Sequence, residues 1–246
     1  MENADKIKIG LLSALVPTII AVLLVVMIAV VVSYVSKMGP TEIARKTEHY
    51  AQLADVSPKN ATVFFGDSIT ELCKTDSVYG EYSIQSNTPV VNRGISAECT
   101  ASMLARVDGS IIVLQPKNLV ILMGVNDLNQ GISKEQITEN IRQIIIAVQQ
   151  KSPHTNIVLQ AVYPTDINRD SFYERFQLKG RDSKTISLLN ENLQAMAQEQ
   201  GVTFLDVTNL LSDENGNLRK DYTFDGLHPN VNGYLAVRDE IIKTLV

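Results

Sequence analysis

The sequence predicts an α/β protein: a three-layer α/β/α sandwich around a parallel sheet, preceded by one N-terminal transmembrane helix. Short continuous apolar runs alternate with amphipathic helical patterns along most of the chain. This alternation is typical of parallel strands that helices cover on both faces. A separate uncharged apolar run near the N-terminus is much longer than the others and predicts the membrane helix.

Composition narrows the class of protein. The chain has 246 residues, which fits one domain and an additional segment. Its net charge is −5, so it lacks the basic surface of a nucleic-acid-binding protein, and we expect no nucleic-acid partner. Its two cysteines, Cys73 and Cys99, match no zinc pattern. They are expected as free or buried thiols, with a single disulfide as the alternative outside the cytoplasm.

The apolar run covers residues 9–36, a stretch of 28 residues without charge. About 20 apolar residues suffice to cross a bilayer, whereas the apolar core of a secretory signal is only about 7–15 residues long. We therefore interpret residues 1–8 as a short tail and 9–36 as an uncleaved single-pass anchor in the cell membrane. A short tail before a long domain favours an extracytoplasmic hydrophilic domain, although flanking charges do not decide the orientation.

A connector at residues 37–60 precedes the predicted domain at 61–246. Pro40 and Pro58 delimit a short connector helix from Thr41 to Ala54. Buried strands are predicted where short runs are rich in Val, Ile, Leu or Phe. These runs are 61–65, 90–92, 119–123, 157–162 and 202–205.

Helix signals separate these strands. Ser133 and Gln136 form a capping box, in which each side chain binds the other residue's backbone N–H. Apolar residues at helical spacing follow it and predict one buried helix face. Those residues are Ile137, Ile141, Ile144, Ile145 and Val148. A second such helix ends at Gly201, and a last one starts near Val231.

Ser68 follows the first predicted strand in the string Gly-Asp-Ser-Ile-Thr at residues 66–70. A serine at the carboxyl end of a strand can present its hydroxyl to a cleft, while its backbone N–H points at a developing oxyanion. The alternative is a strand-to-helix turn in which Asp67 and Ser68 only cap the helix.

Two further segments follow predicted strands. Gly94 lies in Asn-Arg-Gly-Ile-Ser at 92–96 and could bring a backbone N–H close to a substrate, or simply make a turn. Asn126 lies in Gly-Val-Asn-Asp at 124–127, and its amide could hold an oxyanion, or form an Asx turn.

The string Asp-Gly-Leu-His-Pro-Asn at 225–230 places Asp225 three residues before His228. The carboxylate can orient the imidazole, whose other nitrogen then takes the proton of Ser68. His49 and His154 occupy settings that look like exposed surface. No second His or Cys near His228 would complete a metal site, so we expect no metal and no cofactor.

Taken together and in this order, the four segments resemble the four sequence blocks of the GDSL/SGNH hydrolases, across roughly residues 60–240. The resemblance implies a flavodoxin-like sandwich with five parallel strands. It implies that Ser68 is the nucleophile, His228 the base and Asp225 its orienting partner. It further implies an oxyanion hole made by the N–H groups of Ser68 and Gly94 and by the Asn126 side chain. Many relatives have Gly where this chain has an alanine at 97.

The expected activity is that of a serine esterase, which hydrolyses carboxylic esters through an acyl-Ser68 intermediate. Its substrate is expected to be a small-molecule, glycan or lipid ester. A short acyl group is the hypothesis that the family subtype favours. An acyltransferase using the same triad is one alternative, and a non-catalytic binding module on a membrane tether is another.

The stretch 163–183 is long, polar and aromatic, and it could cover the cleft and influence specificity. Its aromatic and basic residues are Phe172, Tyr173, Phe176, Arg169, Arg175 and Arg181. The alternative is a solvated surface loop with a short helix.

Overall fold

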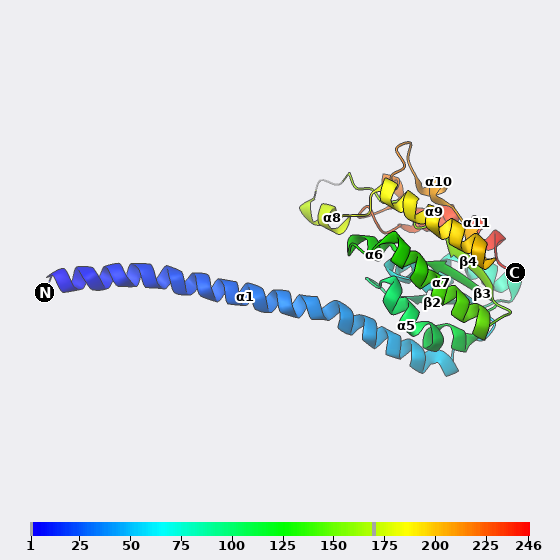
Figure 1. The fold of residues 1–246 in the computed structure, drawn as a ribbon, viewed down its shortest axis with the longest axis horizontal. Coiled ribbons are helices and arrows are strands. Elements are labelled where there is room, and N and C mark those ends of the chain that lie inside the picture. The colour runs from blue at the N-terminus through cyan, green and yellow to red at the C-terminus, as the bar shows by residue number, and fades with distance from the viewer. Residues whose placement is uncertain (1, 169–170) are drawn as a thin grey trace. The chain divides into compact units, whose positions relative to one another are not determined.

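The computed structural model describes residues 2–168 and 171–246. Its described part contains a parallel five-stranded sheet in the order β2-β1-β3-β4-β5 (Figure 1). The strands are β1 Thr62–Gly66, β2 Val90–Gly94, β3 Asn118–Leu122, β4 Asn156–Gln160 and β5 Thr203–Leu205. Every strand lies within two residues of its predicted position, and the predicted fold class is confirmed.

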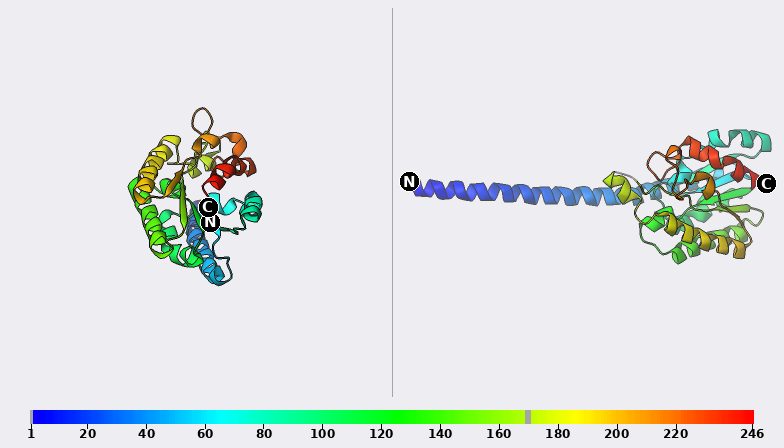
Figure 2. Two further views of the ribbon diagram at one scale, coloured as in Figure 1. Left: turned by 90° about the vertical axis from the view of Figure 1, so that its right-hand side faces the viewer. Right: turned by 90° about the horizontal axis from the view of Figure 1, so that it is seen from above.

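Helices cover both faces of the sheet. α5 (Thr100–Ser110), α7 (Lys134–Lys151) and α9 (Ser183–Gln200) pack side by side on one face. The opposite face carries α11 (Val231–Lys243) with the short α3 (Thr75–Val78) and α4 (Gly80–Ser86), as the end-on view in Figure 2 shows. The remaining short elements are α2 Ser68–Leu72, α6 Val125–Asn129, α8 Phe172–Gln177, α10 Thr208–Leu211, η1 Leu53–Asp55, η2 Ile112–Leu114 and η3 Lys220–Tyr222.

The core lies between the sheet and these helices. All five residues of β1 and of β3 are buried, as expected for central strands covered on both faces. The predicted apolar face of α7 is buried in full, with zero exposure at each of its five positions. Removing such a side chain from water contributes about 1.5–3 kcal/mol per residue, so this face alone anchors α7 firmly to the sheet.

The helix ends agree with the sequence in most respects. Ser133 is the N-cap of α7, and its hydroxyl accepts the N–H of Gln136 at 3.2 Å. The predicted return contact is wrong, because the Gln136 side chain donates to Asn140 at 2.9 Å, one turn further along. Gly201 ends α9 in the left-handed conformation, at φ 65°, as predicted.

α1 runs from Glu2 to Gln52. Its residues up to Arg45 belong to a first compact unit, and the rest of the chain, Lys46–Val246, forms a second. The most apolar part of its described residues has a mean hydropathy of 3.2 over 18 residues, and none of it is buried. By length and composition this helix could cross a membrane, although a signal sequence would meet the same criteria.

The connector differs from its prediction. Pro40 lies inside α1 rather than before a separate helix. A proline removes one helical N–H donor but does not always end the helix. Here α1 continues through Pro40, and the Thr41 hydroxyl donates to the Lys37 carbonyl at 2.8 Å, one turn earlier in the helix. The predicted connector helix is therefore the continuation of α1, with η1 at its end.

Candidate active site

Three segments of the site start at one edge of the sheet. Gly66, at the end of β1, is paired with Gly94 of β2 on one side and Leu122 of β3 on the other. Ser68 and Asn126 follow at once, in α2 and α6. The carboxyl ends of parallel strands thus bring these distant parts of the chain together, as predicted for this architecture.

Close packing at this edge requires glycine at Gly66 and Gly94. A Cβ atom on Gly66 would lie 2.3 Å from the Leu122 carbonyl oxygen, and one on Gly94 would lie 2.2 Å from the Glu71 backbone nitrogen. The Asp67 carboxylate accepts the N–H of Ile69 at 2.9 Å and starts α2. These contacts leave Ser68 at the first position of a helix directly above the strand ends.

Ser68, His228 and Asp225 form a hydrogen-bonded chain. The Ser68 Oγ lies 2.8 Å from His228 Nε2, and His228 Nδ1 lies 2.6 Å from Asp225 Oδ2. Ser68 is 7% exposed, so its hydroxyl is largely shielded from water. Distances of this size are those at which a nucleophile and a base exchange a proton. The three residues that the sequence singled out therefore meet in space.

The charge of Asp225 decides the tautomer of the histidine. Burial alone would raise the pKa of the Asp225 carboxyl. The His228 ring and the backbone N–H groups of His228 and Leu227 instead hold that pKa well below its ordinary value. An ionised carboxylate only accepts hydrogen bonds. We therefore assign the ring proton to Nδ1, which leaves the Nε2 lone pair facing Ser68.

The loop that carries His228 is fixed by its neighbours. The Thr223 hydroxyl donates to the His228 carbonyl at 2.8 Å and accepts the N–H of Gly226 at 2.9 Å. Asn230 then caps α11 through the N–H of Gly233. From α11, the Tyr234 hydroxyl donates to the Ile69 carbonyl at 2.8 Å, which ties this loop to the helix of Ser68.

Asn126 is held from both sides. Its Nδ2 donates one hydrogen to the Glu98 carbonyl at 3.0 Å, and its Oδ1 accepts from Arg181 Nη2 at 2.6 Å. Arg181 also donates to the Val125 carbonyl at 2.9 Å and is only 4% exposed. Burial lowers the pKa of Arg181, while the nearby Asp67 carboxylate opposes that shift. The arginine therefore fixes which end of the Asn126 amide carries the donors.

Gly94 is placed differently from Asn126. Its N–H donates to the Asn92 side chain at 2.9 Å, and its carbonyl accepts the Tyr50 hydroxyl at 2.9 Å. The next residues of the same loop, Ser96 and Ala97, line the hollow at Ser68. Ala97 has φ 63°, a left-handed conformation that a side chain seldom adopts. The part of this loop that faces the serine is thus two to three residues beyond Gly94.

The hollow at Ser68 has a volume of about 340 Å³. Most of its lining residues have polar side chains, and they come from segments far apart in the sequence. The lining residues are Ser68, Leu72, Ser96, Ala97, Asn126, Asn129, Gln130, Gln177, Arg181, Leu227 and His228. A space of this size is at the small end of ligand-binding sites, which range from about 300 to 1,000 Å³.

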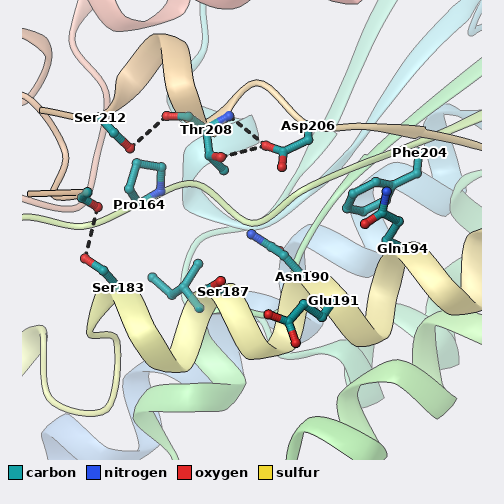
Figure 3. A pocket seen from close by; sticks show the side chains of 12 residues that line it. Pro164, Ser183, Ser187, Asn190, Glu191, Gln194, Phe204, Asp206, Thr208 and Ser212 are labelled. Atoms are coloured by element: carbon teal, nitrogen blue, oxygen red, sulfur yellow. Dashed lines mark hydrogen bonds between the residues drawn. The ribbon is translucent and has the colours of Figure 1, made fainter. Parts of the chain in front are cut away.

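A second hollow of about 320 Å³ lies between α9 and the segment after β5 (Figure 3). It has serine hydroxyls but no histidine among its lining residues. Asp206 there accepts from the backbone N–H and the hydroxyl of Thr208, and Asn190 is bonded to both backbone groups of Val162. The hydroxyls of Ser183 and Ser212 there donate to the backbone carbonyls of Gly216 and Thr208, so neither serine is paired with a base.

A family model described as the GDSL-like lipase/acylhydrolase family matches residues 64–236. The chain belongs to this family. The family supports an ester hydrolase in general, and the resemblance inferred from the four sequence segments is confirmed.

Known relatives of this GDSL-like acylhydrolase share its fold. Platelet-activating factor acetylhydrolase IB subunit alpha1 of Pongo abelii is 27% identical over 192 residues, which cover 77% of each chain. A Streptococcus pneumonia protein, described as a platelet activating factor, is 27% identical with a TM-score of 0.80, covering 89% of this chain and 99% of that one. A lipase/acylhydrolase from Enterococcus faecalis has a TM-score of 0.61 at 20% identity, covering 76% and 97%.

Other sequence-based expectations have mixed outcomes. Cys73 and Cys99 are both free, so the disulfide alternative is not realised. No cluster of metal-binding side chains occurs among the described residues. In the stretch 163–183 the structure forms α8, while Arg169 lies outside the described residues, as do the side chains of Phe172 and Tyr173.

Sequence reasoning gave no role to several residues that support this GDSL-like site. Arg181 was only one arginine of a polar stretch, yet it holds the Asn126 amide. Glu71 binds the loop of Ser96. None of these pairings has a fixed sequence spacing, so no local pattern could have revealed them.

Proposed function

We propose that this acylhydrolase is a serine esterase that hydrolyses carboxylic esters through an acyl-Ser68 intermediate. The observation that carries the proposal is the chain of hydrogen bonds from Ser68 through His228 to Asp225, at 2.8 and 2.6 Å. This is the arrangement by which a weak serine nucleophile becomes reactive near neutral pH.

In the first half-reaction, the Ser68 Oγ bonds to the ester carbonyl carbon while its proton moves to His228 Nε2. The carbon–oxygen bond to the alcohol then breaks, and the alcohol leaves with that proton. In the second half-reaction, water attacks the acyl carbon and passes a proton to His228. The tetrahedral intermediate then collapses, which releases the carboxylic acid and returns the proton from His228 to Ser68. Asp225, ionised throughout, stabilises the imidazolium.

The developing oxyanion would be bound by the Ser68 N–H, by the second Nδ2 hydrogen of Asn126, and by an N–H of the loop after β2. Gly94 is the donor that the family resemblance implies, but its N–H already has Asn92 as acceptor. The Ala97 N–H is the better candidate, because Ala97 lines the hollow beside Ser68 and Asn126. Each such donor is typically worth about 100- to 1,000-fold in rate.

We also propose that the acyl group is short. The hollow is small and lined by amide and guanidinium groups, including Asn129, Gln177 and Arg181, which suit a compact polar ester better than a long chain. The similarity to a subunit of platelet-activating factor acetylhydrolase, at 27% identity, points the same way. The alcohol portion would be a small molecule, a glycan or a lipid.

The test is hydrolysis of p-nitrophenyl acetate, butyrate and octanoate by the full-length protein in detergent. Ser68→Ala should abolish the activity, whereas Ser187→Ala, in the hollow of Figure 3, should retain it. Rates should fall from acetate to octanoate. Equal activity in the parent and Ser68→Ala would refute the mechanism, and a rise with chain length would refute the short acyl group.

We propose, further, that α1 is a membrane anchor and that the hydrolase unit lies outside the cytoplasm. The apolar composition of the helix and its lack of burial support this. The intact mass of the protein from washed membranes tests it, because a cleaved signal sequence would remove the N-terminal residues. Protease digestion of intact cells should remove the hydrolase unit, and full protection would reverse the proposed orientation.

A further inference from the structure

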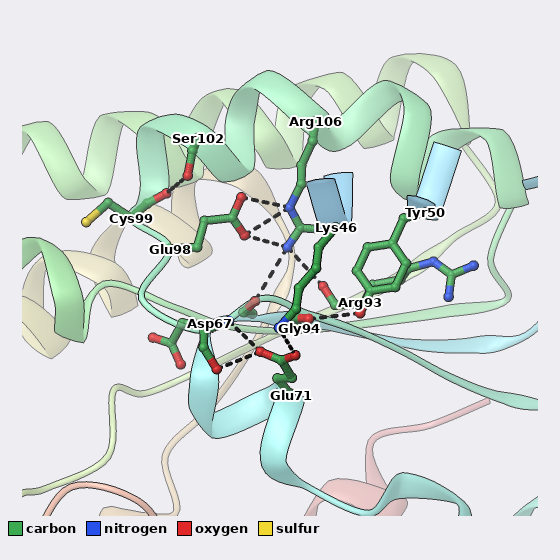
Figure 4. Close-up of polar contacts among 12 residues, drawn as sticks. Lys46, Tyr50, Asp67, Glu71, Arg93, Gly94, Glu98, Cys99, Ser102 and Arg106 are labelled. Carbon is green, nitrogen blue, oxygen red and sulfur yellow. Dashed lines mark hydrogen bonds and ion pairs between the residues drawn. The ribbon is translucent and has the colours of Figure 1, made fainter. Parts of the chain in front are cut away.

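The last turns of α1, residues 46–52, belong to the same compact unit as the hydrolase fold. One of their side chains, Tyr50, contacts the loop at residues 94–98, hereafter the 94–98 loop, and another, Lys46, contacts Glu71 of α2, which binds that loop (Figure 4). The Lys46 ammonium pairs with the Glu71 carboxylate, and the Tyr50 hydroxyl donates to the Gly94 carbonyl at 2.9 Å. The end of this helix therefore contacts a loop that borders the catalytic hollow.

Glu71 links Lys46 to the 94–98 loop. One carboxylate oxygen pairs with Lys46, and the other accepts both the N–H and the hydroxyl of Ser96, each at 2.6 Å. Burial would raise the pKa of the Glu71 carboxyl, but Lys46 and the two Ser96 donors lower it below its ordinary value. Lys46 thus helps to keep Glu71 ionised, which is the state that can accept both bonds.

Tyr50 is fixed by two arginines. The Arg93 guanidinium lies 4.8 Å from the centre of the Tyr50 ring, and that of Arg106 lies 5.9 Å from it. Burial, together with the Glu71 charge, raises the pKa of the Tyr50 hydroxyl, so the hydroxyl keeps its proton and donates it to Gly94. The ring is thereby held in the one orientation that reaches the loop.

The 94–98 loop in turn touches two parts of the site. Ser96 and Ala97 line the hollow with Ser68, and the Glu98 carbonyl accepts from the Asn126 amide at 3.0 Å. A displacement of this loop would therefore move its own N–H groups and Asn126 together. Misplacement of about 1 Å can cost about 100-fold in rate, because oxyanion donors act only over short distances.

We propose that Lys46 and Tyr50 are positioning residues for ester hydrolysis: through Glu71 and the Gly94 carbonyl, they hold the 94–98 loop against Ser68 and Asn126. This proposal rests on the proposed esterase function. It gives the end of the N-terminal helix a part in the reaction besides any role in anchoring.

The test uses full-length protein in detergent with Lys46→Met, Lys46→Arg and Tyr50→Phe. Arg45→Met and Tyr34→Phe are the matched controls, since they remove a positive charge and a phenolic hydroxyl from exposed positions of the same helix. We expect Lys46→Met and Tyr50→Phe each to lower kcat for p-nitrophenyl acetate about tenfold, with KM within about twofold of the parent. Lys46→Arg should recover most of kcat, and the controls should match the parent.

Amide hydrogen exchange of residues 94–100 supplies a readout that needs no activity. Faster exchange there in Lys46→Met and Tyr50→Phe, but not in the controls, would support the proposal together with the fall in kcat. Unchanged exchange would overturn it, and so would faster exchange with an unchanged kcat. If the parent hydrolysed no ester, the proposed function would fail, while exchange would still decide whether the helix holds the loop.

Discussion

The two sides of the hollow at Ser68 are built in different ways. On one side, the 94–98 loop is backed by the Glu98–Arg106 ion pair, whose side chains are at most 1% exposed. On the other side, α8 presents Phe176, which is 66% exposed, and is joined to α6 mainly by Asn129, which donates to carbonyls at the end of α8. The first side suits the fixed demands of a transition state, and the second suits contacts that differ between substrates.

The largest expected effect concerns the buried ion pair. Arg106→Met should lower the free energy of unfolding by about 3–5 kcal/mol, because the Glu98 carboxylate would remain buried without its partner. Burial already raises the pKa of Glu98 even beside Arg106. Urea denaturation measures the loss. Arg142→Met, which breaks an exposed pair with Glu199, should cost less than about 1 kcal/mol. Similar losses of unfolding free energy in both variants would contradict the expected difference between the Glu98–Arg106 pair and the Arg142–Glu199 pair.

Asp67, which precedes Ser68 in the chain, should make the free energy of unfolding depend on pH. Burial raises the pKa of its carboxyl to about 6, whereas an unfolded aspartate has a pKa of about 3.9. The folded protein thus binds this proton more tightly, and the associated stability is complete below pH about 4 and lost as pH rises through about 6. The shift corresponds to up to about 3 kcal/mol.

Asp67→Asn removes this dependence. Urea denaturation at pH 4.5 and 7.5 should therefore show the variant gaining stability relative to the parent as pH rises. Asp108→Asn, at the exposed pair with Lys151, is the control and should keep a constant difference from the parent. The unfolding free energies of Asp67→Asn and the parent are compared at both pH values. If their difference does not change with pH, the Asp67 carboxyl has an ordinary pKa in the folded protein.

Arg181 lies on the same side of the hollow as α8, but its hydrogen bonds to Asn126 and to the Val125 carbonyl hold it in place. Arg181→Lys should lower kcat for p-nitrophenyl acetate about tenfold with little change in KM, because a single ammonium cannot bind Asn126 and the Val125 carbonyl as the planar fork does. Steady-state kinetics measure both constants. Arg175→Lys, in α8, should behave like the parent. A rise in KM without a fall in kcat would assign Arg181 to substrate binding instead.

The smallest expected effect concerns Phe176 of α8. Phe176 is next to Gln177, which lines the hollow, so Phe176→Ser should raise KM for p-nitrophenyl octanoate about two- to fivefold and leave the acetate nearly unchanged. Ile84→Ser, at a residue of α4 that is 83% exposed, is the matched control. A large fall in kcat for acetate would show that α8 belongs to the rigid part of the site.

Local signals in the sequence predicted much of the fold and of the site. Continuous apolar runs marked all five strands, and the central strands β1 and β3 are buried over their whole length, as such runs indicate. The sequence motifs also identified Ser68, Asp225 and His228, which the structure brings into hydrogen-bond contact. Pro40 misled the prediction, because a proline removes one helical N–H donor but does not always end the helix.

The sequence by itself determined the layered α/β architecture, the apolar N-terminal helix and the choice of Ser68, His228 and Asp225, which form one hydrogen-bonded chain. These features depend on periodicity and on short motifs, which are local properties of a chain. Only the tertiary structure decided that Arg181 holds Asn126, that Ala97 rather than Gly94 lines the hollow at Ser68, and that Tyr50 binds the 94–98 loop while Lys46 pairs with Glu71. Each of those contacts joins residues whose separation along the chain follows no rule, so only packing brings them together.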